Sequence, residues 1–255
     1  MFFNNKILSI NQPYFFPYIG YFHLIESANK IVFYDDVNYI KGGWINRNRI
    51  LINGSDYLFT IPVKKGSQNK LINEITPIID KKFKCKFLTT IKTAYHKAPY
   101  YNQVNDLIQD VIHQEYDSIS DMAINSITSV YDYLGKEIKW TKSSICSPFT
   151  KGMDKADRLI KITKDLGYHK YVNLIYGQKL YSKDYFLNSG VELYFIKSDI
   201  VSYRQFDNEF IPSLSIIDVL MFNDKRSIKN QFAAYSLTQN YLLGEKSTPS
   251  NRLKG

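Results

Sequence analysis

Two arginines separated by one residue, Arg47 and Arg49, are the strongest sign of ligand chemistry in this sequence. They lie in the run Trp44-Ile45-Asn46-Arg47-Asn48-Arg49-Ile50. Along an extended backbone, successive side chains point to opposite faces, so the two guanidinium groups project together and the two asparagines share the other face. Because guanidinium groups make bidentate, charge-assisted contacts with anions, we expect this run to bind a pyrophosphate or a carboxylate.

Two carboxylates follow the short apolar run Ile31-Val32-Phe33-Tyr34. Asp35 and Asp36 could bind a divalent cation, act as a general base or hold ligand hydroxyls. Adjacent strand residues point in opposite directions, and we expect Asp36, which is nearer the loop, to face the site. Two structural alternatives stay open: a buried capping role for Asp36, and an ion-pair network between the two aspartates and the two arginines.

A histidine before a proline turn could complete the chemistry. His96 stands in Tyr95-His96-Lys97-Ala98-Pro99, where a helix end can present an imidazole into a cleft, although a surface position is equally open. No G-x-S-x-G nucleophile elbow is present. Cys85 and Cys146 have neither CxxC spacing nor a nearby His pair, so we expect reduced thiols and no zinc site.

A βαβ unit must position the first of these groups. An apolar run at 7–10 precedes Gln12-Pro13-Tyr14-Phe15-Phe16-Pro17-Tyr18-Ile19-Gly20-Tyr21, a helical pattern covers 19–28, and the strand at 31–34 follows. Open parallel sheets bind ligands at the carboxyl ends of their strands. The segment that begins at Gln12 and the pair Asp35-Asp36 should therefore meet at one edge of the sheet.

The later elements predict the rest of the fold. Asn53-Gly54 should turn a hairpin between residues 50–52 and 57–63. Helical spacing runs through three segments between 83 and 135, and then returns at 155–166 and 181–188 before a strand at 191–196. We predict an α/β fold with a Rossmann-like, mainly parallel sheet, a hairpin extension and a helical insertion. The division is an α/β core (1–80 and 139–240), the insertion (81–138) and a polar tail (245–255).

Composition favours an anionic small-molecule partner. Net charge is +9, from 33 Lys and Arg against 24 Asp and Glu, although scattered lysines also follow from an AT-biased genome. Twenty-one tyrosines suit a groove for sugars or nucleotides, and equally an ordinary wet surface. No leader and no eighteen-residue apolar window is present, so we expect no membrane span and a cytoplasmic location. No residue pattern specifies a cofactor or an oligomeric state.

Several blocks together resemble the WbqC-like protein family. They are the Gln12–Tyr21 segment, Tyr34-Asp35-Asp36-Val37, Asn46-Arg47-Asn48-Arg49-Ile50, Thr60-Ile61-Pro62-Val63, Tyr203-Arg204-Gln205 and Leu214-Ser215-Ile216-Ile217-Asp218. Members of this family are typically encoded among bacterial genes for surface polysaccharides such as O-antigen. The resemblance implies transfer of an amino-acyl or related group onto an amino sugar.

The resemblance also implies site residues. His96 and Asp36 would be catalytic, and substrate would contact Gln12, Tyr14, Asn46, Arg47, Asn48, Arg49, Gly177, Tyr181, Gln205 and Asp218. The chain departs from the family pattern at one place. Relatives tend to carry a serine-glycine turn where this chain has Asn173-Leu174-Ile175-Tyr176-Gly177, which weakens the prediction that the backbone of this segment binds an anion. A looser similarity to nucleotidylyltransferase-like folds extends to architecture alone, since their two loop histidines are missing here.

Three functions follow as expectations. The first is a transferase acting on a nucleotide-linked amino sugar in surface polysaccharide biosynthesis, with direct attack by the acceptor and no protein nucleophile. The second is a noncatalytic sugar- or glycan-binding component of a polysaccharide-assembly complex. The third is transfer from a charged tRNA, for which the lysine excess would form the contact surface and binding would depend steeply on salt.

Overall fold

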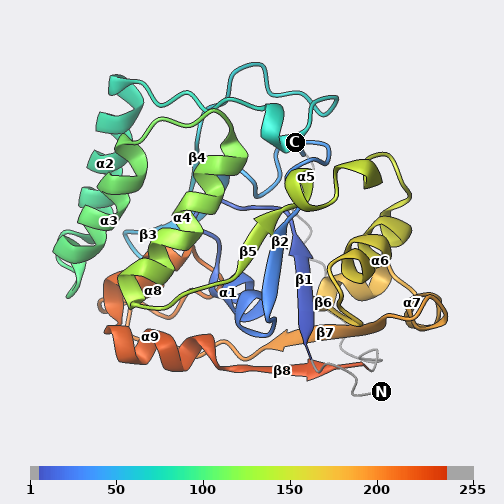
Figure 1. Ribbon diagram of the computed structural model, residues 1–255. Coiled ribbons are helices and arrows are strands. Elements are labelled where there is room, and N and C mark those ends of the chain that lie inside the picture. Colours follow the sequence, from blue (N-terminus) through green and yellow to red (C-terminus); the bar gives the residue numbers. More distant parts are fainter. Residues whose placement is uncertain (1–5, 240–255) are drawn as a thin grey trace.

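The computed structural model describes residues 6–239, without the side chains of Tyr176 and Lys179. The polar tail expected at 245–255 lies outside the described residues. A six-stranded sheet forms the centre, in the order β5-β2-β1-β6-β7-β8 (Figure 1). The strands are β1 (Ile7–Asn11), β2 (Lys30–Phe33), β5 (Trp140–Lys142), β6 (Lys170–Leu174), β7 (Glu192–Ser198) and β8 (Tyr235–Thr238). All neighbours are parallel except β7 and β8, which confirms a mostly parallel sheet.

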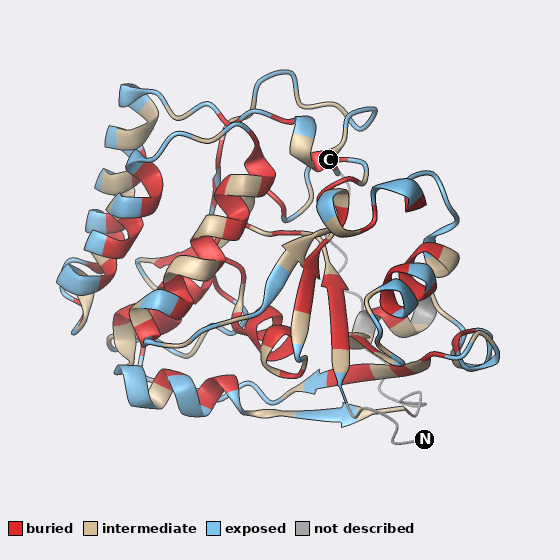
Figure 2. Ribbon diagram, viewed as in Figure 1, coloured by how far each residue is buried: buried red, intermediate tan, exposed pale blue. Residues whose placement is uncertain are grey.

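Successive residues of the central strands pack on opposite faces of this sheet. In β6, Tyr171 joins one hydrophobic cluster with Leu8 and Leu159, whereas Val172 joins another with Leu24. This alternation is the period-two geometry of an extended chain. Because both faces are covered, the middle residues of β1, β2 and β6 are buried (Figure 2).

Helices from different parts of the chain cover the two faces. Residues of α6 (Lys155–Asp165) and α7 (Lys183–Asn188) pack in the cluster that contains Leu8 and Tyr171. The larger cluster contains residues of α1 (Ile19–Glu26), α8 (Ile216–Phe222) and α9 (Lys225–Phe232). No helix within residues 6–239 is both long enough and apolar enough to cross a membrane.

The predicted hairpin is present as a separate two-stranded sheet. It comprises β3 (Arg47–Ile52) and β4 (Ser55–Thr60), paired antiparallel. Asn53 (φ 51°) and Gly54 (φ 75°) turn the chain between them. Two consecutive positive φ angles are what the commonest two-residue hairpin turn requires, and Asn-Gly adopts them at low cost.

The three predicted helices between 83 and 135 are also present. They are α2 (Lys81–Tyr95), α3 (Tyr101–His113) and α4 (Ile119–Leu134), which lie to the left of the central strands in Figure 1. Their buried residues belong to the same cluster as those of α1, β3 and α8. The segment 81–138 therefore shares a core with its surroundings, and its separation as an insertion stays a prediction.

Short helical turns follow several strands. They are η1 (Ile72–Glu74), α5 (Ser143–Cys146), η2 (Pro148–Thr150) and η3 (Ile175–Lys179). The helix expected at 181–188 begins two residues later, at Lys183. Ser182 accounts for this boundary, because its side chain accepts a hydrogen bond from the Tyr185 backbone N–H and caps the first turn.

Candidate functional site

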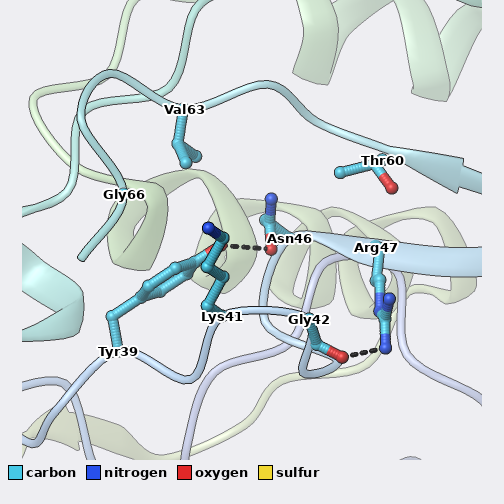
Figure 3. Close-up of a pocket in the computed structure, with 8 residues that line it drawn as sticks. All are labelled: Tyr39, Lys41, Gly42, Asn46, Arg47, Thr60, Val63 and Gly66. Carbon is cyan, nitrogen blue, oxygen red and sulfur yellow. Dashed lines mark hydrogen bonds between the residues drawn. The ribbon is translucent and has the colours of Figure 1, made fainter. Parts of the chain in front are cut away.

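A cationic pocket of about 290 Å³ lies where the loop after β2 meets the start of β3 (Figure 3). We call it the Arg47 pocket. Its lining residues are Tyr39, Lys41, Gly42, Asn46, Arg47, Thr60, Val63 and Gly66. None of these eight residues is acidic, and two carry positive charge. A pocket with this lining attracts anions.

Arg47 presents its guanidinium group along one wall. One Nη donates a hydrogen bond to the Gly42 carbonyl, and the group lies 5.4 Å from the centre of the Trp44 ring. Its Nε is buried and has no hydrogen-bond partner among the described residues. A buried N–H of a charged group without an acceptor is costly, so a ligand oxygen that accepted this hydrogen bond would bind favourably.

The floor of the pocket is already hydrogen-bonded. The Tyr39 hydroxyl donates to Asn46 Oδ1 at 2.8 Å, and Asn46 Nδ2 donates to the Ile61 carbonyl at 2.7 Å. Burial raises the pKa of Tyr39, and the nearby Arg47 charge opposes this shift. Asn46 thus shapes the pocket, while Arg47 and Lys41 supply its charge.

Arg49 does not join Arg47 in the pocket. It forms an ion pair with Asp56 at 3.1 Å, and its guanidinium lies 5.7 Å from the centre of the Trp44 ring. The expected alternation along β3 is present, since Asn48 is buried whereas Arg47 and Arg49 are half-buried. Among the described contacts, neither arginine pairs with Asp35 or Asp36, so the alternative ion-pair network is not formed.

Asn48 instead holds the turn after β1. Its Nδ2 donates to the Phe16 carbonyl at 2.6 Å, and Ser215 Oγ donates to the same carbonyl at 2.7 Å. The Phe16 N–H donates to Ser126 Oγ at 2.8 Å. Phe16 has a φ of 40°, which is unfavourable for a bulky side chain and persists only where surrounding contacts enforce it.

The turn after β1 contacts the residues that flank Arg47 but does not line the Arg47 pocket. The Phe15 N–H donates to the Ile45 carbonyl at 3.0 Å, yet no residue of 12–20 lines the pocket. Gln12 and Tyr14 lie at the carboxyl end of β1, where the Tyr14 hydroxyl and Gln12 Oε1 are 3.4 Å apart. Gln12 and Tyr14 therefore lie outside the Arg47 pocket, and their contact with substrate stays a prediction.

Asp36 is 5% exposed and lies beyond the carboxyl end of β2. Its Oδ2 accepts a hydrogen bond from Arg158 Nη2 at 2.6 Å, and its Oδ1 accepts one from Ser143 Oγ. Arg158, on α6, also donates to Thr150 Oγ1 at 3.0 Å. Both carboxylate oxygens are engaged, so this geometry gives Asp36 a positioning role and leaves proton abstraction as an untested prediction.

Asp35 is enclosed by hydrogen-bond donors. The Ser144 hydroxyl and backbone N–H donate to its two oxygens at 2.6 and 3.0 Å, and Asn73 Nδ2 donates at 3.3 Å. Within residues 6–239, no three His, Cys, Asp or Glu side chains gather as metal ligands would. The aspartates anchor α5 and η1 to the edge of the sheet.

His96 is an exposed residue at the carboxyl end of α2. Its Nδ1 lies 3.0 Å from the Lys92 carbonyl. It does not line the Arg47 pocket.

The glycine segment after β6 forms the short helix η3. A side chain at Gly177 would come within 3.0 Å of Asn173 Nδ2, so the glycine allows a close approach. Tyr181 is half-buried with its ring 5.8 Å from Phe186, and burial raises its pKa. Neither Gly177 nor Tyr181 lines the Arg47 pocket.

Gln205 and Asp218 meet in a buried network that Tyr95 and Tyr203 complete. Asp218 accepts hydrogen bonds from the Tyr95 and Tyr203 hydroxyls, both at 2.7 Å, and from Gln205 Nε2 at 2.6 Å. Burial raises the pKa of Asp218, although these three hydrogen bonds favour its ionised form. The network joins α2, α8 and the segment around 203–205, and it is closed to solvent at the carboxylate.

Residues 12–230 of the sequence match the model of the WbqC-like protein family. The chain belongs to the WbqC-like protein family. It is 24% identical over 221 residues to the uncharacterized protein Rv1507c of Mycobacterium tuberculosis, an alignment that covers 86% of this chain and 94% of the relative. No solved structure shows a significant match.

Sequence reasoning missed several residues of this WbqC-like protein. Tyr39 and Lys41 lie in a loop without periodicity, so nothing marked them as pocket residues. The sequence does offer one sign for Arg158, because it adjoins Leu159 and Ile160 in a predicted helix. In the structure this arginine is 3% exposed. A buried arginine requires an anionic partner, and the carboxylates after β2 were available.

Proposed function

We propose that this WbqC-like protein is a transferase that acts in the cytoplasm on a nucleotide-linked amino sugar during bacterial surface polysaccharide biosynthesis. In the reaction, the sugar amine attacks the carbonyl carbon of an acyl donor, the new N–C bond replaces the bond to the leaving group, and the amine proton is released. The Arg47 pocket binds the diphosphate of the nucleotide sugar.

The charge of the pocket carries this proposal. Arg47 and Lys41 place two cations in a lining that contains no carboxylate. Phosphate oxygens satisfy both groups. The volume of about 290 Å³ suits the diphosphate and leaves the rest of the ligand on the adjacent surface.

The topology supports the same assignment. The strands β5, β2, β1, β6 and β7 are parallel, and the chain builds the sheet outward from β1 first on the β2 side and then on the β6 side. Rossmann-like sheets have a switch of this kind, and their ligands bind beyond the carboxyl ends of the strands. Tyr39 and Lys41 belong to the loop that follows β2 at this edge. Exposed Trp44, beside the pocket, offers an aromatic surface for the base or sugar.

A noncatalytic sugar- or glycan-binding protein is the second candidate. The positions of the two residues expected to transfer protons favour this candidate. Both carboxylate oxygens of Asp36 accept hydrogen bonds, and His96 is exposed outside the Arg47 pocket. Once turnover is measurable, Asp36→Asn and His96→Ala test whether these two residues take part in the reaction. Full turnover in both variants would remove these residues from the mechanism.

The test is calorimetry with UDP-N-acetylglucosamine and UDP, followed by mass spectrometry of UDP-glucosamine, which carries a free amine, after incubation with candidate acyl donors. We expect Arg47→Ala to weaken UDP-sugar binding at least tenfold. Arg49→Ala is the matched control from the same strand, and should leave binding almost unchanged. Binding without a mass change in the sugar supports the second candidate, and absence of nucleotide-sugar and UDP binding overturns the pocket assignment.

A further inference from the structure

A second pocket, of about 320 Å³, contains no charged side chain in its lining. We call it the Gln231 pocket. It is lined by Val201, Ser202, Tyr203, Asn223, Ser227, Asn230 and Gln231. The first three follow the carboxyl end of β7, and the others come from the end of α8 and from α9. Its chemistry therefore differs from that of the Arg47 pocket.

Tyr203 provides an aromatic wall of fixed orientation. Its hydroxyl donates to Asp218 Oδ1 at 2.7 Å, and its ring packs 5.1 Å from Phe210 and 6.3 Å from Phe222. The buried hydrogen bond to Asp218 therefore fixes the orientation of the Tyr203 ring, which lines the Gln231 pocket. Aromatic rings held in this way suit the apolar faces of ring-shaped polar ligands.

Gln231 leaves one polar atom without a partner. The residue is 6% exposed, and its Nε2 donates to Asn223 Oδ1 at 3.0 Å. Its Oε1 is buried and has no hydrogen-bond donor among the described residues. A buried acceptor of this kind requires a donor, which a ligand hydroxyl would supply.

The rim adds groups that both donate and accept. Ser202 and Asn230 are exposed, and their side chains form no hydrogen bond with the described part of the protein. Carboxamides and hydroxyls can each meet a ligand hydroxyl in either role.

We propose that the Gln231 pocket binds one uncharged carbohydrate ring, with Gln231 Oε1 accepting a hydrogen bond from a sugar hydroxyl and Tyr203 forming the wall. The inference goes beyond the proposed function and does not depend on it, because it rests only on the lining of this pocket. A volume near the lower limit for small-molecule sites suits a single ring.

Ligand-observed NMR titration with glucose, galactose, rhamnose and N-acetylglucosamine tests the proposal. We expect at least one of them to bind in the millimolar range, and glucose 6-phosphate to bind more weakly than glucose. Ser202→Phe, which fills the rim, and Asn230→Ala should each weaken that binding, Ser202→Phe by at least tenfold. Both substitutions are at exposed positions, so the fold should survive, which circular dichroism checks.

Arg47→Ala is the control from the other pocket. It should keep the affinity for the neutral sugar while it loses affinity for UDP-N-acetylglucosamine, so failure of one pocket assignment leaves the other intact. The proposal is overturned if none of the four sugars binds. It is also overturned if Arg47→Ala removes sugar binding while Ser202→Phe and Asn230→Ala retain it.

Discussion

Asp36 and Asp218 are both buried carboxylates, 5% and 0% exposed, but their surroundings differ in charge. Asp36 pairs with the Arg158 guanidinium, whereas Asp218 accepts hydrogen bonds from two tyrosine hydroxyls and one carboxamide. A buried charge with a cationic partner becomes costly when that partner is lost. A buried charge held by neutral donors is costly while it stays ionised, which is why the pKa of Asp218 is raised.

The largest effect should follow Asp36→Asn. The substitution leaves the Arg158 charge buried without a counter-ion, and we expect the free energy of unfolding to fall by about 3–5 kcal/mol. Urea denaturation measures the change. Adding Arg158→Met to the same variant should recover much of the loss, and a double variant no more stable than Asp36→Asn alone would contradict an ionic origin.

Asp218→Asn should cost less, about 1–3 kcal/mol, because no ion pair is broken, although the new carboxamide nitrogen cannot accept the hydrogen bond that a carboxylate oxygen accepted. The same urea experiment compares the two isosteric substitutions directly. If Asp218→Asn destabilised the protein as much as Asp36→Asn, the distinction between charged and neutral partners would fail.

The pH dependence of stability should distinguish Asp218 further. Burial raises the pKa of Asp218 in the folded state above its usual value of 3.8, so its stabilising contribution is complete below pH 3.8 and declines as the pH rises through the folded-state pKa. The stability of the wild type relative to Asp218→Asn should therefore increase as the pH is lowered from 7 towards 4. Denaturation series at several pH values measure this difference, and a constant difference would contradict the raised pKa.

The smallest effect should come from the surface pair Arg49–Asp56. The two side chains are 34% and 48% exposed, so water and salt screen their attraction. We expect Asp56→Ala to change the free energy of unfolding by less than about 1 kcal/mol. A loss as large as that of Asp36→Asn would show that exposure does not separate these two ion pairs.

Local patterns in the sequence predicted most of the elements but few of their long-range partners. The Asn53-Gly54 turn and the alternation along β3 are encoded by neighbouring residues, so they could be derived from the sequence. The partner of Asp36 is 122 residues away, and Asp218 meets Tyr95 across 123 residues. Such pairings depend on how the helices and strands pack against one another, so the spacing of residues within one helix or strand cannot predict them.

The candidate site shows the same division. The sequence indicated that Arg47 and Arg49 project to one side, which the burial pattern of β3 confirms. It did not indicate that Arg49 would form an ion pair with Asp56. It also did not indicate that the loop residues Tyr39 and Lys41 would line the pocket with Arg47. Side-chain direction follows from strand geometry, whereas the neighbours of a side chain follow from tertiary structure.

The strained turn at Phe16 has a consequence for the order of events during translation. Its carbonyl accepts a hydrogen bond from Ser215, which the ribosome adds 199 residues later. Its N–H donates to Ser126, 110 residues downstream. In a nascent chain that ends before α8, Asn48 alone donates to this carbonyl, so the turn should gain its full set of hydrogen bonds only when the carboxyl-terminal third has been synthesised.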